Sequence, residues 1–114
     1  MEKRVEKPWG FEIIWAQTDR YVGKILHINK SHRLSRQYHE KKEETIRVLS
    51  GTLSLEIGEI GPGFITHMLY PGDTFHIAPR CVHRMKAMLG DVEVLEVSTP
   101  ELEDVVRIED DYMR

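Results

Sequence analysis

Short runs in which apolar residues alternate with polar ones dominate this chain, and helical spacing is almost absent. Leu53, Leu55 and Ile57 alternate with three polar residues, as expected for a strand with one buried face. Between residues 92 and 97 apolar residues occupy parts of both faces, which is typical of a barrel wall with neighbours on each side. The pattern predicts strands at 10–16, 21–29, 34–38, 45–50, 52–57, 64–69, 74–77, 82–88 and 91–98.

Glycine, proline, aspartate and serine separate these runs, and the composition of 58–63 predicts a loop. The acidic segment from 101 to 114 is expected to hold a short helical turn around Glu103 to Arg107. Many short strands at even spacing predict an all-β sandwich or barrel of the jelly-roll kind. A chain of 114 residues fits one domain spanning 1–114.

The charge balance and the cysteine count narrow the class of protein. Sixteen basic and 19 acidic residues give a net charge of −3, which argues against a nucleic-acid binder. A single cysteine, Cys81, excludes an internal disulfide and any paired-cysteine zinc motif. The N-terminus lacks an apolar signal core and no apolar run approaches the length of a membrane span, so we expect a soluble, cytoplasmic protein.

Exposed edge strands also indicate the oligomeric state. Small barrels must protect such strands, and the apolar strand from Phe11 to Trp15 could pair with a second subunit. A homodimer is therefore expected.

Four residues have the composition and spacing of a metal site: Gln37, His39, Glu44 and His83. Gln37 and His39 are two residues apart, so on a strand they point to the same face. Two imidazoles, a carboxylate and an amide oxygen suit a divalent transition metal with an open position, whether zinc, iron, manganese, cobalt or nickel. If Gln37 only supports the ligands, the remainder is the two-histidine, one-carboxylate set of non-haem iron. Glu43 is the alternative carboxylate, and we favour Glu44.

A second group of residues suits catalysis or anion binding. Lys24 shares a predicted strand face with apolar residues, so it either belongs to a site or extends its ammonium to solvent. His76 lies just before a proline turn and either lines a cavity or lies on the surface. Arg107 and Arg114 could bind an anion through their planar guanidinium groups, or form salt bridges with the neighbouring acids.

The order of these residues resembles the two motifs of the cupin superfamily. The first cupin motif places two ligands at H-x-H, then a glutamate, then a glycine; here Gln37, His39, Glu44 and Gly51 occupy that frame. The second motif resembles 72–83, which ends on its ligand histidine. The resemblance implies a double-stranded β-helix, or jelly-roll barrel, that holds a metal ion.

Within the cupins, the chain is similar to the type II mannose-6-phosphate isomerase domain, often fused behind a mannose-1-phosphate guanylyltransferase. The specific matches are Lys-Pro-Trp-Gly at 7–10 and Asp-Tyr-x-Arg at 111–114, and the similarity spans nearly the whole chain. The chain departs from that family's usual residues beside the ligands and at its end, at Glu40, Lys41, Lys42, Thr45, Ile46, Lys86, Ala87 and Met113.

This resemblance implies a metal-dependent aldose–ketose isomerisation of a sugar phosphate, such as mannose 6-phosphate. The metal would stabilise the enediolate oxygens, and Lys24 or His76 would act as the general base. Arg107 and Arg114 would hold the phosphate, with Lys42 or Arg84 as alternatives. Two other functions remain open: a different metal-dependent cupin enzyme such as a non-haem dioxygenase, and a non-catalytic sugar-binding module.

Overall fold

The computed structural model describes residues 2–58 and 63–113. These residues form an all-β protein without α-helix, so the predicted fold class is confirmed. The strands of the described residues are β1 Lys3–Lys7, β2 Gly10–Gln17, β3 Val22–Ile28, β4 His32–Arg33, β5 Arg36–Tyr38, β6 Glu44–Ser50, β7 Leu53–Gly58, β8 Phe64–Leu69, β9 Thr74–Ile77, β10 Val82–Ala87, β11 Val92–Ser98 and β12 Val106–Glu109.

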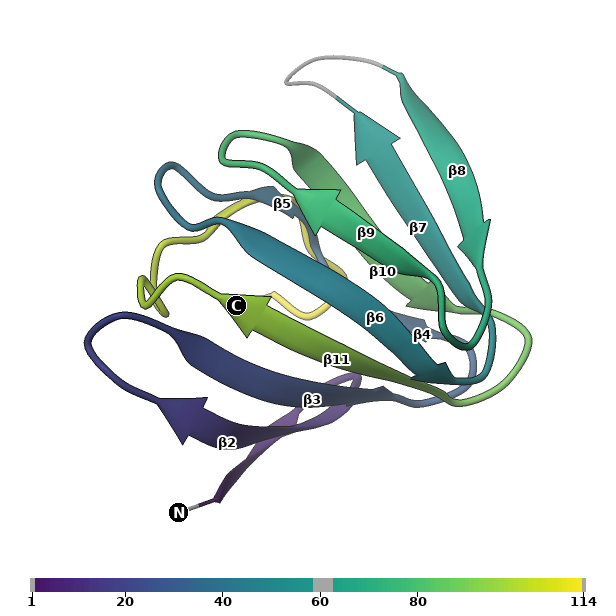
Figure 1. The fold of residues 1–114 in the computed structure, drawn as a ribbon. Coiled ribbons are helices and arrows are strands. Elements are labelled where there is room, and N and C mark those ends of the chain that lie inside the picture. The colour runs from purple at the N-terminus through teal and green to yellow at the C-terminus, as the bar shows by residue number, and fades with distance from the viewer. Residues whose placement is uncertain (1, 59–62, 114) are drawn as a thin grey trace.

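Two antiparallel sheets face each other across the core (Figure 1). In the described residues the first sheet has the order β1-β2-β3-β11-β6-β9 and the second has the order β12-β5-β10-β7-β8, with β4 paired to β10. From β6 onward the chain passes back and forth between the sheets: β6, β9 and β11 lie in the first sheet, and β7, β8, β10 and β12 lie in the second. This alternation produces a jelly-roll barrel, the double-stranded β-helix that the motifs predict.

The core lies between the sheets because alternate residues of each strand point inward. Leu26 and Ile46 of the first sheet and Leu55 and Met85 of the second are at most 3% exposed and belong to one cluster. At one end of the barrel, charged side chains replace apolar ones on the same inward faces, and this end forms the candidate site.

The alternation in β7 predicts that its polar, outward-facing side chains are exposed to solvent, but they are buried. Glu56 points away from the core and is still only 2% exposed. Arg36 Nη2 lies 2.8 Å from its carboxylate, and Lys86 forms a second ion pair with it. The polar face of the second sheet is therefore covered by its own charged network.

The two ends of the chain differ from the sequence-based expectations. Strand β1 was not predicted, and it pairs with β2, so the apolar strand around Phe11 to Trp15 has neighbours on both sides and is not an edge strand. The helical turn expected around Glu103 to Arg107 is wrong: a turn at Leu102 and Glu103 is followed by strand β12, which pairs with β5. The loop expected at 58–63 lies largely outside the described residues.

The described chain contains no helix of the length and apolarity needed to cross a bilayer.

Candidate metal centre

Three buried side chains converge at one end of the barrel. His39 directly follows β5, Glu44 begins β6 and His83 lies in β10, opposite Gln37 of β5. His39 Nε2 is 3.6 Å from Glu44 Oε2, and His83 Nε2 is 3.6 Å from Glu44 Oε1. The three ligand atoms all lie within 4.8 Å of one another.

Hydrogen bonds to backbone carbonyl groups fix which nitrogen of each imidazole faces the site. His39 Nδ1 donates to the carbonyl oxygen of Asp104 at 2.5 Å, and His83 Nδ1 donates to that of Cys81 at 3.0 Å. Each Nε2 is then left with a lone pair, as is usual for metal-bound histidine. Neither Nε2 has a hydrogen-bond partner among the described residues, although both are buried.

Burial also sets the protonation state of these ligands. It lowers the pKa of His39 and the pKa of His83, so both imidazoles are neutral at neutral pH. Two neutral nitrogens with free lone pairs and a carboxylate, all buried, are the donor set of a divalent transition metal. The residues therefore fit the ion that the sequence predicts.

Lys42 lies directly beside this group. Its ammonium is 3.1 Å from Glu44 Oε2 and 3.2 Å from Glu96 Oε2, and the side chain is only 6% exposed. Burial lowers the pKa of Lys42, but the carboxylates of Glu96 and Glu44 outweigh that effect and raise it above its ordinary value. The ammonium therefore remains charged next to the candidate metal ligands.

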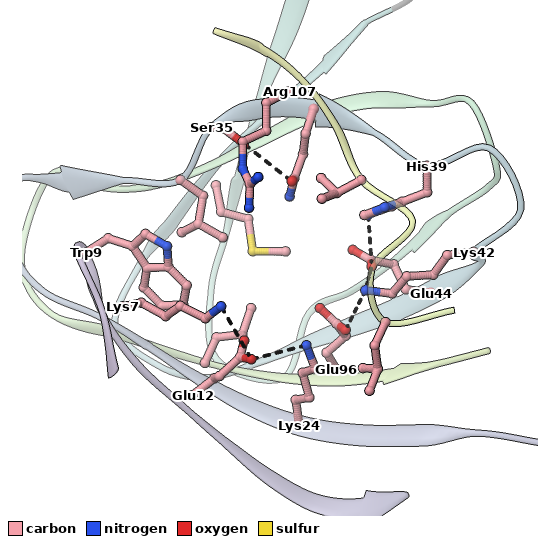
Figure 2. Close-up of a pocket in the computed structure, with 16 residues that line it drawn as sticks. Lys7, Trp9, Glu12, Lys24, Ser35, His39, Lys42, Glu44, Glu96 and Arg107 are labelled. Atoms are coloured by element: carbon pink, nitrogen blue, oxygen red, sulfur yellow. Dashed lines mark hydrogen bonds and ion pairs between the residues drawn. The ribbon is translucent and has the colours of Figure 1, made fainter. Parts of the chain in front are cut away.

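A cavity of about 100 Å³ extends from two of the candidate metal ligands, His39 and Glu44, into the barrel (Figure 2). Lys24 lines it and lies 3.3 Å from Glu12, so this inward lysine is paired with a carboxylate. Glu12 is also 3.8 Å from Lys7. Charged side chains thus occupy both the metal end and the opposite wall of the cavity. Its lining consists of Lys7, Trp9, Glu12, Lys24, Leu26, Leu34, Ser35, Gln37, His39, Lys42, Glu44, Met85, Glu96, Leu102, Val105 and Arg107.

Arg107 of β12 supplies a cation without a carboxylate partner. Figure 2 shows its guanidinium pointing into the cavity from the side opposite Glu12 and Lys24. Arg107 forms no ion pair with the described residues, unlike Lys24 and Lys42. Gln37 lines the same cavity, and its Oε1 accepts a hydrogen bond of 3.3 Å from Ser35.

Other predicted site residues lie elsewhere. Arg84 is buried on the outward face of β10, where it donates to the carbonyl oxygen of Leu34. His76 is exposed and pairs with Glu43, which the sequence offered as the alternative to Glu44 as a metal ligand. The structure does not bring either residue into the cavity. Arg114 lies outside the described residues.

Sequence reasoning overlooked two acidic cavity residues, Glu12 and Glu96. Both stand on inward faces among apolar neighbours, as Lys24 does. An inward charge in an alternating strand was the signal that singled out Lys24, and the same signal applied to these two glutamates. Strand alternation gave no such signal for Trp9 and Lys7, because they lie in a short link before β2 and at the end of β1. Only the Lys-Pro-Trp-Gly match at 7–10 singled them out.

Comparison with known proteins defines the class of protein. The profile described as "Cupin domain" matches residues 24–98, which is more than half of the chain. The chain therefore belongs to the cupin family. No curated protein is similar enough in sequence to match it.

Three solved structures illustrate how widely this fold is used. The capsular polysaccharide assembling protein CapF from Staphylococcus aureus is 14% identical with a TM-score of 0.84, over 96% of this chain and 32% of CapF. KdgF from Halomonas sp. is 20% identical with a TM-score of 0.75, over 90% of this chain and 91% of KdgF. Oxalate decarboxylase from Lactobacillus farciminis is 19% identical with a TM-score of 0.76, over 94% of this chain and 33% of that enzyme.

At these identities the likeness shows the fold alone. The chain spans about a third of the length of CapF and of oxalate decarboxylase.

Proposed function

We propose that this chain is a metal-dependent cupin enzyme that isomerises a sugar phosphate of the mannose 6-phosphate type. One observation carries the proposal: two buried imidazole nitrogens without hydrogen-bond partners face one carboxylate, that of Glu44. Glu44 lines a cavity that also contains a guanidinium, that of Arg107, with no ion-pair partner among the described residues. The first part of this arrangement suits a metal ion, and the second suits an anionic substrate. The resemblance to type II mannose-6-phosphate isomerase supports the reaction.

His39, Glu44 and His83 would hold the ion. Gln37, which lines the cavity, would supply a fourth, oxygen-donating ligand. The bound ion would act as a Lewis acid toward the substrate carbonyl and the enediolate formed from it. One carboxylate among neutral ligands would leave the site with net positive charge. Zinc, iron, manganese, cobalt and nickel all accept such donors.

The paired residues on the opposite wall can move the proton between C1 and C2. Lys24 Nζ lies 3.3 Å from the carboxylate of Glu12. In this pair Lys24 would donate a proton and Glu12 would abstract one. This assignment differs from the sequence-based one, in which Lys24 was nominated as the general base: here Glu12 takes the role of the base and Lys24 that of the proton donor. His76 is exposed outside the cavity lining, so we do not assign it this role.

Arg107 is the best candidate for the phosphate. A guanidinium binds phosphate through two parallel hydrogen bonds, and Arg107 has no competing carboxylate among the described residues. Lys42 also lines the cavity, but two carboxylates already engage it. Arg84 lies on the far side of its sheet, and Arg114 is outside the described residues.

Metal analysis of the purified protein, together with an assay of mannose 6-phosphate conversion to fructose 6-phosphate, tests this function. Each candidate metal is restored in turn to chelator-treated protein. Bound metal with turnover that disappears on chelation supports the isomerase. Bound metal without turnover on any hexose phosphate contradicts it.

The ligand set itself favours one second candidate. Two histidines and one carboxylate form the facial triad of non-haem iron oxygenases. A dioxygenase would retain iron and consume oxygen when given its substrate, whereas an isomerase consumes none. Ligand binding without either reaction would instead identify a sugar-binding module.

We also propose a homodimer in the cytoplasm, formed through the outward face of the first sheet. Trp15 is 40% exposed and Val97 is 46% exposed on that face. Adjacent exposed apolar residues commonly mark interfaces. Sedimentation analysis of wild-type protein and of Trp15→Glu distinguishes a dimer through this face from a monomer.

A further inference from the structure

Lys42 contacts the carboxylate oxygen that a metal ion would need. Glu44 presents Oε1 to His83, with 3.6 Å between Oε1 and Nε2. It presents Oε2 to His39, also at 3.6 Å, and the ammonium of Lys42 lies 3.1 Å from that same Oε2. The ammonium thus competes with any cation that His39 and Glu44 share.

Glu96 holds the ammonium in this position. It lies in β11, which pairs with β6 and places Glu96 opposite Ile46. Its Oε2 is 3.2 Å from Lys42 Nζ, and both side chains are 6% exposed. Charged groups buried to this degree are retained only when they are paired. The three side chains form one buried unit with a net charge of −1.

We propose that Lys42 is a tethered counter-ion that neutralises Glu44 in the metal-free protein and weakens metal binding, while Glu96 strengthens it. This inference rests on the metal site of the proposed function and not on its reaction. When a metal ion binds Glu44, the Lys42 ammonium loses its pairing with Glu44 and remains paired with Glu96 alone. Lys42 is a positioning residue here, and its charge sets how readily the site loads and releases its ion.

Charge changes at the two positions have opposite consequences. Lys42→Met removes a buried cation and leaves two carboxylates facing the site, so metal binding tightens by at least about tenfold. Glu96→Gln keeps the size of the side chain but removes a negative charge, so metal binding weakens by at least about tenfold. Lys42→Arg retains the charge and leaves the affinity near that of wild type.

Calorimetric titration of the metal-free full chain with Zn²⁺, and separately with Mn²⁺, at neutral pH measures these affinities. Lys86→Met is the matched control, because Lys86 also pairs with a buried carboxylate, that of Glu56, but on the opposite face of the second sheet. We expect the Lys86→Met variant to bind metal with the affinity of the wild type. Thermal unfolding of each metal-free variant reports structural damage separately.

A Lys42→Met protein that melts at a lower temperature but binds metal with wild-type affinity overturns the proposal, since Lys42 would then have only a structural role. If Lys42→Met does not fold, unchanged affinity in Glu96→Gln overturns it equally. Absence of metal binding by every variant overturns both this inference and the metal site. Altered affinities in a protein without isomerase activity support this inference and contradict only the proposed reaction.

Discussion

The imidazole of His39 donates its Nδ1 proton to the backbone carbonyl of Asp104, 65 residues further along the chain, at 2.5 Å. The C-terminal segment thereby determines which nitrogen of a candidate metal ligand faces the site. In Figure 1 this segment, in yellow-green, passes close to the loop between β5 and β6. The candidate metal centre is thus completed by a part of the chain that comes after the two segments that resemble the cupin motifs.

The carboxylate of Asp104 strengthens this connection. It accepts hydrogen bonds from the backbone N–H groups of Glu40, Lys41 and Lys42, at 3.1, 2.7 and 3.0 Å. The bonds from Lys41 and Lys42 lower the pKa of the Asp104 carboxyl, so the interaction persists until the pH falls well into the acid range. The loop that carries Lys42 is therefore anchored to the C-terminal segment.

We expect Asp104→Ala to release this loop and to weaken metal binding by about tenfold, in the range measured for groups that orient metal ligands. Faster amide hydrogen exchange at residues 40–42 would accompany the loss. Asp73→Ala is a suitable control, because Asp73 caps a turn between β8 and β9 and does not line the cavity. Equal metal affinity in Asp104→Ala and wild type would show that the anchor does not position the ligand.

Removing either candidate histidine ligand is expected to abolish both metal binding and turnover. His39→Ala and His83→Ala each leave one imidazole and one carboxylate, too few donors for a stable site. Metal content after dialysis, measured by plasma mass spectrometry, should fall to near zero in both. His76→Ala should retain its metal, because His76 lies outside the cavity. Full metal content in both ligand variants would refute the site.

The buried, neutral histidines predict how the stability of the metal-free protein changes with pH. Burial lowers the pKa of His39 and of His83 in the folded state below the ordinary value of 6.5. Below that value the unfolded chain binds more protons than the folded one, so stability falls as pH decreases toward the lowered pKa values. Each imidazole contributes a slope of at most about 1.4 kcal/mol per pH unit.

Urea unfolding in the presence of a chelator, repeated across this range, measures the slope. A His83→Gln variant has only one of the two buried imidazoles, so its slope should be clearly smaller. The two proteins should show the same flat dependence above the ordinary histidine pKa. Identical curves at lower pH would mean that His83 is not a buried neutral imidazole in the metal-free protein.

Substrate affinity tests the role of Arg107. Arg107→Gln should retain its metal and raise KM for a sugar phosphate by about tenfold or more, because a charge-assisted pair with phosphate is lost. The matched variant Arg4→Gln removes an exposed arginine that pairs with Glu6 on β1, and neither residue lines the cavity. KM should not change in that control. An unchanged KM in Arg107→Gln would exclude it as the phosphate ligand.

Local patterns in the sequence account for much of the fold and for the central donors. Alternation of apolar and polar residues placed nearly every long strand, and it assigned Lys24 to an inward face, where the structure has it. The spacing of His39, Glu44 and His83 indicated residues that the structure does bring together. These features depend on strand periodicity, which can be read from neighbouring residues.

Features that depend on long-range pairing could not be predicted in this way. The segment that forms β12 reads as a possible helical turn by composition, and only its pairing with β5 makes it a strand. Likewise, the position of Lys42 depends on Glu96, which lies on a different strand. A charged residue in a polar loop carries no local sign that it will be buried. The domain boundaries 1–114 remain a prediction.

Gly51 offers a last test, because it is the one residue of the first cupin motif whose role is purely conformational. It lies between β6 and β7 with a φ of +78°, and a Cβ there would lie 2.3 Å from the carbonyl oxygen of Asp91. Gly51→Ala should therefore destabilise the protein by about 1–3 kcal/mol or more, from backbone strain and the clash with fixed backbone.

Gly90 is the matched control. A Cβ at Gly90 meets no atom within 4 Å, and its φ lies outside the left-handed range. Gly90→Ala should leave stability unchanged or raise it by up to about 1 kcal/mol, because alanine restricts the unfolded chain. Urea denaturation of both variants measures the difference. Equal stability of the two would mean that the turn after β6 relaxes freely, and the turn geometry at Gly51 would then not constrain Glu44 at the start of that strand.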